Sequence, residues 1–267
     1  MTDPLADLPP LPALGPVSRQ APPGGAPRRW LPGVVVEVRA ETRHARTLRL
    51  ELPAGSPAHV PGQHYVVRLR RDDGSWAQRS YSVASAPERG DRNSPGRPRQ
   101  IELTVERLDD GELSPYLHEV SPGDVLQVRG PFGGWFIWRG DTPVLLVGGG
   151  SGVVPLMSMT RYWRQIGRPV PLQLLVSARS PQDLFYTAEY GAETTLVYTR
   201  QAPEGFARPP SRLDAGTLQP LVDAALAAPG TVAYVCGSAG FAEAASQLLV
   251  QLGLNAGSIR VERFGPA

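Results

Sequence analysis

The pattern of hydrophobic residues changes near residue 140, and this change limits the fold more than any other feature of the chain. Before it, short runs rich in Val, Leu and Tyr recur between turns that contain Gly and Pro. Such runs predict strands, and many short strands indicate a barrel or a sandwich. We expect them at 34–38, 47–52, 64–69, 78–83, 101–107 and 125–130.

After residue 140, apolar runs alternate with helix-like stretches, a pattern typical of βαβ units around a parallel sheet. We expect strands at 144–147, 172–176, 195–198, 232–235 and 259–263, a helix ending near Ile166 and a last helix at 241–252. The segment between the strands at 195–198 and 232–235 gives no clear pattern. A short helix at 114–120, with Ser114 as a candidate cap, interrupts the first half.

The fold class predicted from these patterns is β followed by α/β. Residues 29–139 are expected to form an antiparallel Greek-key β-barrel, and residues 140–267 a Rossmann-like domain with a parallel sheet. Residues 1–28 hold eight of the 29 prolines and are expected to be a disordered tail. The charged stretch 88–99 is expected to be a mobile hairpin loop.

Composition excludes several classes of protein. The 27 Lys and Arg nearly balance the 25 Asp and Glu, which gives no electrostatic reason to expect nucleic acid as partner. Cys236 is the one cysteine, so a disulfide within the chain and a Cys-ligated iron–sulfur cluster, which needs about four ligands, are excluded. The four histidines lack metal-ligand spacing, so we expect no metal site.

The chain shows no sequence signal for a membrane or for export. No apolar run approaches the ~20 residues that cross a bilayer. No basic flank precedes an apolar core at the N-terminus, as it would in a secretory signal. We therefore expect no membrane insertion and a cytoplasmic location.

Residues 148–155 read Gly-Gly-Gly-Ser-Gly-Val-Val-Pro and lie between a predicted strand and a predicted helix. Free N–H groups and the positive end of a helix dipole attract phosphate there, and glycines let the backbone approach it closely. Pro155 stands where the dinucleotide fingerprint has its third glycine. A tight strand–helix turn without a ligand is the alternative. Because no Lys-Ser/Thr follows, a nucleoside triphosphatase is disfavoured.

A second candidate site lies in the predicted strand that contains Arg79-Ser80-Tyr81-Ser82. Strand alternation places Arg79 and Tyr81 on one face. A guanidinium beside a phenol can hold a phosphate and pack on an aromatic ring. An ordinary strand with an exposed pair is the alternative interpretation.

These two segments belong to a series of short motifs that occur in a fixed order. The series is Arg79-x-Tyr81-Ser82, Gly111-x-x-Ser114, Gly130-Pro131-Phe132-Gly133, Gly150-x-Gly152-x-x-Pro155, Cys236-Gly237 and Glu262-Arg263-Phe264. It resembles the ferredoxin–NADP reductase superfamily, and within it the reductase modules of bacterial oxygenase systems. The resemblance covers about residues 30–267.

The resemblance implies a flavin on the barrel. Arg79 would hold the flavin pyrophosphate, Tyr81 would pack on the isoalloxazine, and Ser82 would hydrogen-bond near N5. A helix N-terminus for the pyrophosphate would favour FAD over FMN. The flavin-binding residues that it implies are Arg79, Tyr81, Ser82, Val83, Ala84, Ser85, Gly111, Leu113 and Ser114.

The resemblance also implies that the glycine loop cradles a nicotinamide dinucleotide, with Cys236 beside the nicotinamide. Phe264 would lie near the flavin, with Glu262 as a polar or proton-handling neighbour. A small apolar core residue is the alternative for Cys236, because no nearby His supports a nucleophile. The implied dinucleotide residues are Gly149, Gly150, Ser151, Gly152, Pro155, Cys236 and Gly237, and Phe264 is implied as a further cofactor-binding residue at the flavin. The residues implied around the reaction centre are Tyr81, Ser82, Cys236, Glu262 and Phe264.

The preference for NADPH or NADH depends on the ends of the next two strands. Proteins that bind NAD place a carboxylate there, whereas this chain has Ser177 and Arg179, with Thr199 and Arg200 after the following strand. Arginine suits a 2′-phosphate, so NADP is favoured over NAD. Solvated surface arginines are the alternative.

The sequence thus predicts a flavin-dependent oxidoreductase that passes electrons from NAD(P)H to a separate partner, such as a ferredoxin or an oxygenase component. The acceptor is expected to be separate because the chain lacks the cysteines for a fused ferredoxin domain and the length for a globin. Three alternatives stay open: a reductase of free flavin or of a small molecule, a flavin-binding electron-transfer subunit of a larger complex, and a nucleotide-binding module without flavin.

Overall fold

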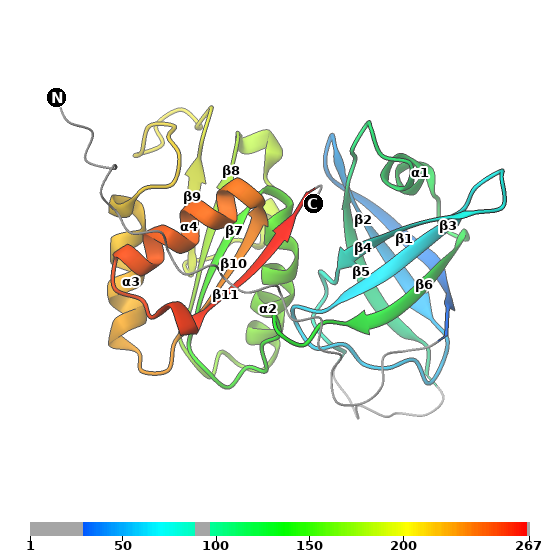
Figure 1. The fold of residues 1–267 in the computed structure, drawn as a ribbon, viewed down its shortest axis with the longest axis horizontal. Coiled ribbons are helices and arrows are strands. Elements are labelled where there is room, and N and C mark those ends of the chain that lie inside the picture. The colour runs from blue at the N-terminus through cyan, green and yellow to red at the C-terminus, as the bar shows by residue number, and fades with distance from the viewer. Residues whose placement is uncertain (1–28, 89–96, 266–267) are drawn as a thin grey trace.

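A computed structural model describes residues 29–88 and 97–265. Two sheets lie side by side along the long axis of the molecule (Figure 1). The predicted tail at 1–28 and most of the predicted loop at 88–99 lie outside the described residues. Within the described ranges, no helix has the length and apolar character needed to cross a membrane.

The first sheet has six antiparallel strands in the order β4-β3-β6-β1-β2-β5. Val83, directly after β4, bridges Leu103 of β5, so the two edges of the sheet meet and the sheet closes into a barrel. Its elements are β1 (Leu31–Thr42), β2 (Ala45–Leu52), β3 (His64–Arg70), β4 (Trp76–Ser82), β5 (Arg99–Glu106), α1 (Leu113–Glu119) and β6 (Val125–Phe132).

Alternation along the strands fills the barrel. In β2, Leu48, Leu50 and Leu52 are buried, while Arg49 and Glu51 between them are partly exposed. Successive side chains of a strand point to opposite faces, so one face supplies the core and the other keeps its charges. The order of the strands places β6 between β1 and β3, which is the long return of a Greek key.

The second sheet has five parallel strands in the order β11-β10-β7-β8-β9. Helix α2 covers the face toward the barrel, and α3 and α4 cover the other face (Figure 1). The strands are β7 (Val144–Gly149), β8 (Leu172–Ala178), β9 (Thr194–Tyr198), β10 (Val232–Ser238) and β11 (Ile259–Phe264), and the helices are α2 (Val153–Gln165), α3 (Ala215–Ala227) and α4 (Ala239–Gln251), with short 3₁₀ turns η1 (Gly150–Gly152), η2 (Pro181–Asp183), η3 (Thr187–Glu189) and η4 (Ala256–Ser258).

Every predicted strand is present, but one helix was not predicted and one expectation, the Ser114 cap, was wrong. Helix α3 was not predicted, because Pro220 inside it lacks an N–H and disguises the helical pattern. Its N-cap is Asp214, whose carboxylate accepts the N–H of Thr217 at 2.9 Å. Ser114 does not cap α1: Glu112 occupies the cap position, and the Ser114 hydroxyl accepts the N–H of Leu108 at 3.0 Å.

One apolar cluster crosses the seam between the two sheets. Ala45 and Ala84 of the barrel belong to the same buried cluster as Met157 of α2 and Trp138 of the connecting segment. The Trp138 N–H donates to the carbonyl of Pro61 at 3.1 Å. The connecting segment is therefore packed against both halves.

Gly130 of β6 faces a ring that leaves no room for a side chain. A Cβ at this position would lie 2.6 Å from Cδ1 of Tyr65, whose side chain is fully buried. We expect Gly130→Ala to lower the free energy of unfolding by roughly 1–3 kcal/mol through overpacking, measured by chemical denaturation. Gly134→Ala is the matched control, because a Cβ there meets nothing within 4 Å. Equal unfolding midpoints for the two variants would contradict the packing argument.

Candidate functional site

The strand β4 carries the first group of predicted site residues. Arg79 and Tyr81 pair with Val67 and Tyr65 of β3, so they share one face of the sheet, as alternation predicts. The Arg79 guanidinium is exposed and donates only to the neighbouring carbonyl of Gln78, at 2.9 Å, among the hydrogen bonds of the described residues. An exposed cation thus lies on the face where an anion is expected.

Tyr81 and Ser82 lie closer to the core. The Tyr81 ring packs against the barrel cluster, and burial raises the pKa of its phenol to about 12, although Arg79 opposes this shift. Ser82 pairs with His64 of β3 and is buried. The phenol is therefore neutral at physiological pH, and its ring can pack on a ligand.

The residues after β4 separate into two environments. The Val83 side chain is fully buried in the barrel cluster. Ser85 instead lies in a polar pocket at the seam, where its hydroxyl accepts the N–H of Glu102 at 3.1 Å. The structure therefore brings Arg79, Tyr81 and Ser82 together, while Ser85 contacts the other half of the molecule.

Helix α1 lies beside β4 and carries the next predicted residues. Leu113 is buried in the barrel cluster, and Ser114 bonds to the loop before the helix. Glu112, at the helix start, is held by Arg71 through a 2.6 Å bond from Nη2 to Oε2. This ion pair offsets a negative charge near the place where the sequence predicts a pyrophosphate.

The glycine loop, residues 148–152, joins β7 to α2. Gly150 has φ +56°, a conformation that favours glycine, and a Cβ there would meet nothing within 4 Å. A Cβ at Gly152 would lie 2.1 Å from the carbonyl oxygen of Cys236, and one at Gly149 would lie 2.7 Å from the Phe241 ring. Close packing thus requires a glycine at positions 149 and 152, and the positive φ angle favours a glycine at position 150.

Two neighbouring residues complete this loop. Ser151 is partly buried within the turn η1, and Pro155 is the third residue of α2 and is buried. A proline in the first turn of a helix leaves no hydrogen bond unmade. The open space at Gly150 therefore lies directly before a helix start, which is the arrangement that favours a phosphate.

The carboxyl ends of β10 and β11 hold four more predicted residues, and two of them, Cys236 and Gly237, approach the glycine loop. Cys236 pairs with Gly148 of β7 on one side and with Glu262 of β11 on the other. Phe264 pairs with Ser238 and packs against the cluster on the α2 side of the sheet. Gly237 follows Cys236 and has its own backbone contact with Gly149, since a Cβ on it would lie 3.1 Å from the Gly149 carbonyl oxygen.

Burial controls the chemistry of Cys236 and Glu262. It raises the pKa of the Cys236 thiol well above its ordinary value, and the nearby Glu262 carboxylate adds to this shift. A thiol of this kind stays protonated and is a poor nucleophile. Burial also raises the pKa of Glu262 to about 7, and its Oε2 has no hydrogen-bond partner among the described residues.

The predicted 2′-phosphate residues lie at one edge of the sheet. Ser177 pairs with Gly149 across β7 and β8. After β9, the N–H of Thr199 donates to the Ala178 carbonyl and that of Arg200 to the Arg179 carbonyl, both at 2.9 Å. Both arginines are exposed. Their guanidinium groups therefore lie at the surface, Arg179 directly after β8 and Arg200 just after β9.

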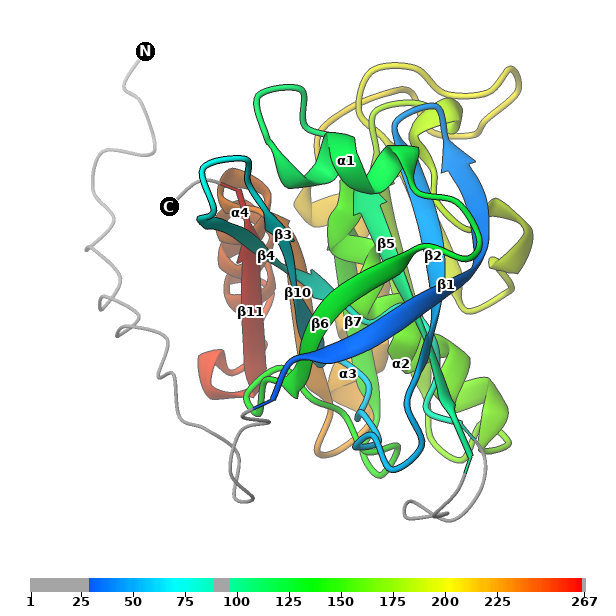
Figure 2. The same cartoon turned by 90° about the vertical axis from the view of Figure 1, so that its right-hand side faces the viewer.

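Three features of the described residues suit a dinucleotide and a flavin. The end of β11 lies on the side of the molecule that holds β3 and β4 (Figures 1 and 2). The exposed Arg79 cation, the open space at Gly150 and the unpartnered Oε2 of Glu262 are the groups that suit these cofactors. Within residues 29–88 and 97–265, no group of His, Cys, Asp and Glu is arranged to hold a metal ion.

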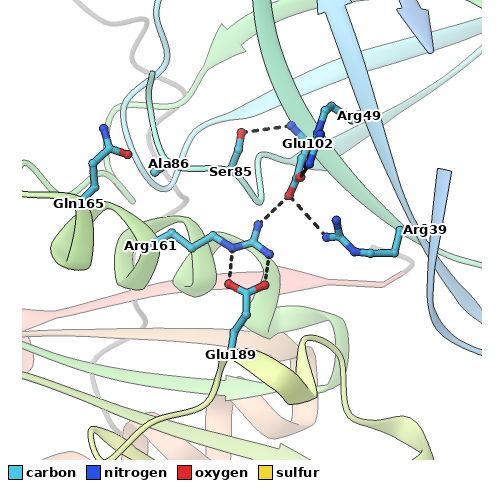
Figure 3. A pocket seen from close by; sticks show the side chains of 8 residues that line it. All are labelled: Arg39, Arg49, Ser85, Ala86, Glu102, Arg161, Gln165 and Glu189. Atoms are coloured by element: carbon cyan, nitrogen blue, oxygen red, sulfur yellow. Dashed lines mark hydrogen bonds and ion pairs between the residues drawn. The ribbon is translucent and has the colours of Figure 1, made fainter. Parts of the chain in front are cut away.

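Sequence reasoning missed the polar pocket on the other side of the seam. It is an open pocket of about 370 Å³ and is shown in Figure 3. The sequence held only part of the signal: Ser158, Arg161 and Gln165 recur at helical spacing and indicate a polar face of α2, but the partners of that face are distant in sequence. The pocket is lined by Arg39, Arg49, Ser85, Ala86, Glu102, Arg161, Gln165 and Glu189.

Comparison with known proteins agrees with this geometry. Residues 32–137 match the model of the oxidoreductase FAD-binding domain, and residues 146–247 match that of the oxidoreductase NAD-binding domain. The flavohem-like FAD/NAD-binding domain of nitric oxide dioxygenase from Vibrio cholerae shares the fold, with a TM-score of 0.69 and 21% identity over 90% of this chain and 100% of that one.

Curated relatives include reductase components of oxygenase systems. The chain is 40% identical to the glycine betaine monooxygenase reductase subunit of Chromohalobacter salexigens, over 48% of this chain and 33% of that protein. It is 28% identical to the ferredoxin–NAD(P)(+) reductase component of naphthalene 1,2-dioxygenase/salicylate 5-hydroxylase systems from a Ralstonia species, over 90% of this chain and 71% of that protein. The chain thus spans only a third of the length of the first of these relatives. The two domain models, matched in order on the expected two-sheet fold, identify an oxidoreductase FAD-binding domain followed by an oxidoreductase NAD-binding domain, which is the arrangement expected from the resemblance to the ferredoxin–NADP reductase superfamily.

Proposed function

We propose that this chain is an FAD-dependent NAD(P)H oxidoreductase that passes electrons to a separate acceptor protein, such as a ferredoxin or an oxygenase component. One observation carries the proposal: the glycine loop of the parallel sheet meets Cys236, Cys236 pairs with Glu262 of β11, and the end of β11 lies on the side of the molecule that holds β4, the strand of Arg79 and Tyr81. The names of the two curated relatives described above support the choice of acceptor.

In this proposal the barrel binds the flavin. Arg79 holds the pyrophosphate through charge-assisted hydrogen bonds, Tyr81 packs on the ring, and the Ser82 hydroxyl lies near the reacting edge. The exposed Arg79 guanidinium and the neutral, partly buried Tyr81 phenol support these roles. Val83 and Leu113 act from within the core, and Gly111, Ser114 and Ser85 remain predicted contacts.

The second sheet binds the dinucleotide in the same proposal. The glycine loop and the start of α2 receive the phosphates, and Pro155 fixes the first turn. Cys236 and Gly237 border the nicotinamide, with Glu262 as a proton-handling neighbour and Phe264 beside the flavin ring. FAD supplies the chemistry, because it accepts a hydride and returns electrons one at a time.

Two further parts of the proposal concern organisation and place. The flavin-binding unit extends over residues 29–139 and the dinucleotide-binding unit over residues 140–267, and the packing of Trp138 at the seam supports a boundary there. The cytoplasmic location, expected from the single cysteine, is carried as a prediction.

The visible spectrum of the purified chain tests the function directly. We expect a bound flavin band that NADPH bleaches under anaerobic conditions and that ferricyanide restores. The variant Tyr81→Ala tests the proposed ring contact. It should lose flavin on gel filtration, because the substitution removes that contact. A colourless chain that does not bind added FAD would exclude the proposal, and a flavin that leaves the parent chain on gel filtration would favour a free-flavin reductase.

NADPH is proposed as the preferred donor because Arg179 and Arg200 lie exposed at neighbouring strand ends. Hydrogen bonds to a charged group contribute about 1.5–3 kcal/mol, which is roughly a 10- to 100-fold change in affinity. Replacing both by glutamine should raise the KM for NADPH by that factor and leave the KM for NADH unchanged. Arg43→Gln, an exposed arginine in the β1–β2 turn, is the control. The idea fails if both KM values move together.

Glu262 should make stability depend on pH. Its folded pKa of about 7 lies above the ordinary 4.5, so ionisation of the buried carboxylate costs free energy as the pH rises through this interval. The free energy of unfolding should therefore fall by roughly 3 kcal/mol in total as the pH rises from about 4.5 to above 7. Glu262→Gln should remove this loss, so that denaturation midpoints of the flavin-free variant exceed those of the parent at about pH 8 but not at about pH 4.5.

The surface carboxylate Glu243, which pairs with Arg263, provides the control for this comparison. Glu243→Gln should leave the pH profile of the parent unchanged. A Glu262→Gln variant with the same profile as the parent would mean that the carboxylate is solvated in the folded chain.

A further inference from the structure

Helix α2 is hydrogen-bonded to the barrel by three side chains that donate to one stretch of backbone. We call this stretch, residues 84–87, the post-β4 segment. Ser158 Oγ donates to the Ser85 carbonyl at 2.7 Å, Arg161 Nη1 to the Ala84 carbonyl at 2.9 Å, and Gln165 Nε2 to the Pro87 carbonyl at 2.8 Å. The donors lie three and four residues apart, so they form one face of the helix.

This contact joins the two predicted cofactor sites through rigid elements. The post-β4 segment directly continues the strand that carries Arg79, Tyr81 and Ser82. At its other end, α2 begins directly after Gly152 of the glycine loop. Arg161 lies nine residues beyond Gly152, about 13.5 Å along a helix at about 1.5 Å per residue. A shift of α2 at Arg161 is therefore transmitted to the glycine loop.

Arg161 is the charged donor among the three, and its two carboxylate partners line the polar pocket (Figure 3). Besides the Ala84 carbonyl, it donates to Glu102 of β5 at 2.8 Å and, from Nε, to Glu189 of the second half at 2.9 Å. The side chains of Arg161 and Glu102 are 14% and 11% exposed, so solvent screens this pair little. The guanidinium thus bridges the two halves at a buried position.

The barrel side of the pocket is built to keep Glu102 ionised. Arg49 bonds its Oε1 at 3.1 Å, and Arg39 lies 3.7 Å from its Oε2. Burial alone would raise the pKa of Glu102, but Arg161, Arg39 and Arg49 outweigh it and hold the pKa below its ordinary value. The acceptor for Arg161 is therefore charged and fixed from its own side.

We propose that Arg161, supported by Ser158, is a positioning residue that fixes the glycine loop relative to the flavin-bearing strand. This inference rests on the proposed function. Hydride transfer requires reacting atoms about 3–3.5 Å apart, and a displacement of about 1 Å far from the chemistry can reduce the rate 100-fold. Two domains joined by a modest interface move relative to one another unless specific contacts hold them.

The neighbouring Arg164 supplies a matched control. It lies on the same helix and bonds to the Glu189 carbonyl at 2.6 Å and to the Glu193 carboxylate. Both partners belong to the second half, so Arg164 makes a similar bond that does not cross the seam. Arg161→Gln therefore removes bonds that reach the barrel, whereas Arg164→Gln removes bonds of the same kind that stay within the second half.

The kinetic test follows flavin absorbance in a stopped-flow instrument as the FAD-loaded chain is mixed with NADPH. We expect Arg161→Gln to lower the limiting rate of flavin reduction by roughly 10- to 100-fold, with FAD affinity and the Kd for NADPH close to those of the parent. Arg161→Lys should recover part of the rate, because it keeps the charge but not the forked geometry. Arg164→Gln should react at the parent rate.

A second readout does not depend on activity. In the chain without added cofactors, the Ala84 N–H donates to the Glu102 carbonyl and the Glu102 N–H to the Ser85 hydroxyl. We expect Arg161→Gln, but not Arg164→Gln, to speed hydrogen exchange at these amides. Ser158→Ala removes a single bond, and it should produce the same two changes to a smaller extent. It serves as the test variant if Arg161→Gln fails to fold.

The outcomes separate this inference from the proposed function. A parent chain that NADPH reduces, together with equal rates and equal exchange for Arg161→Gln and Arg164→Gln, overturns the positioning role and leaves the function in place. A parent chain that NADPH does not reduce removes the function, and the exchange comparison then decides alone whether Arg161 fixes the seam.

Discussion

The backbone of the glycine loop touches the backbone at the carboxyl end of β10, and the rest of the candidate site depends on this approach. No side chain fits between them, since a Cβ on Gly152 would lie 2.1 Å from the Cys236 carbonyl oxygen. Parallel strands end at one edge of their sheet, and the pairing of β10 with β11 places Glu262 beside Cys236 at that edge. The site therefore follows from sheet geometry and from the absence of side chains in the loop.

The seam between the two sheets has two sides with different composition. One side carries β4 and the end of β11, with the exposed Arg79 and the partly buried Phe264. The other side carries the polar pocket and a second set of bonds from Tyr186, whose hydroxyl lies 2.5 Å from Thr104 Oγ1 and whose N–H donates to Glu41 at 3.2 Å. The first side also has a fixed contact, because Arg260 of β11 donates to the Ile137 carbonyl at 2.9 Å.

The sequence predicted the elements of the fold better than their contacts. Strands were identifiable because apolar residues alternate, as in β2, or form a continuous run, as in β7. Helix α3 was missed because Pro220 conflicts with a helical pattern, although its cap at Asp214 is local information. The pocket around Arg161 depends on β5, α2 and η3, which are distant in sequence, so no local pattern could specify it. The predicted roles of the cofactor residues stay predictions, although the structure gathers most of them at two strand ends.

The charges in the polar pocket call for an explanation other than stability. Removing two ions from water costs nearly as much free energy as their attraction returns, so a buried ion pair is weak evidence for a stabilising role. The apolar cluster that contains Ala45, Trp138 and Met157 already holds the halves together, but hydrophobic contact has no preferred direction. A guanidinium that donates to a carbonyl and to two carboxylates has a defined direction. The two kinds of contact are therefore complementary: the apolar cluster provides the attraction across the seam, and Arg161 fixes the orientation in which that attraction acts.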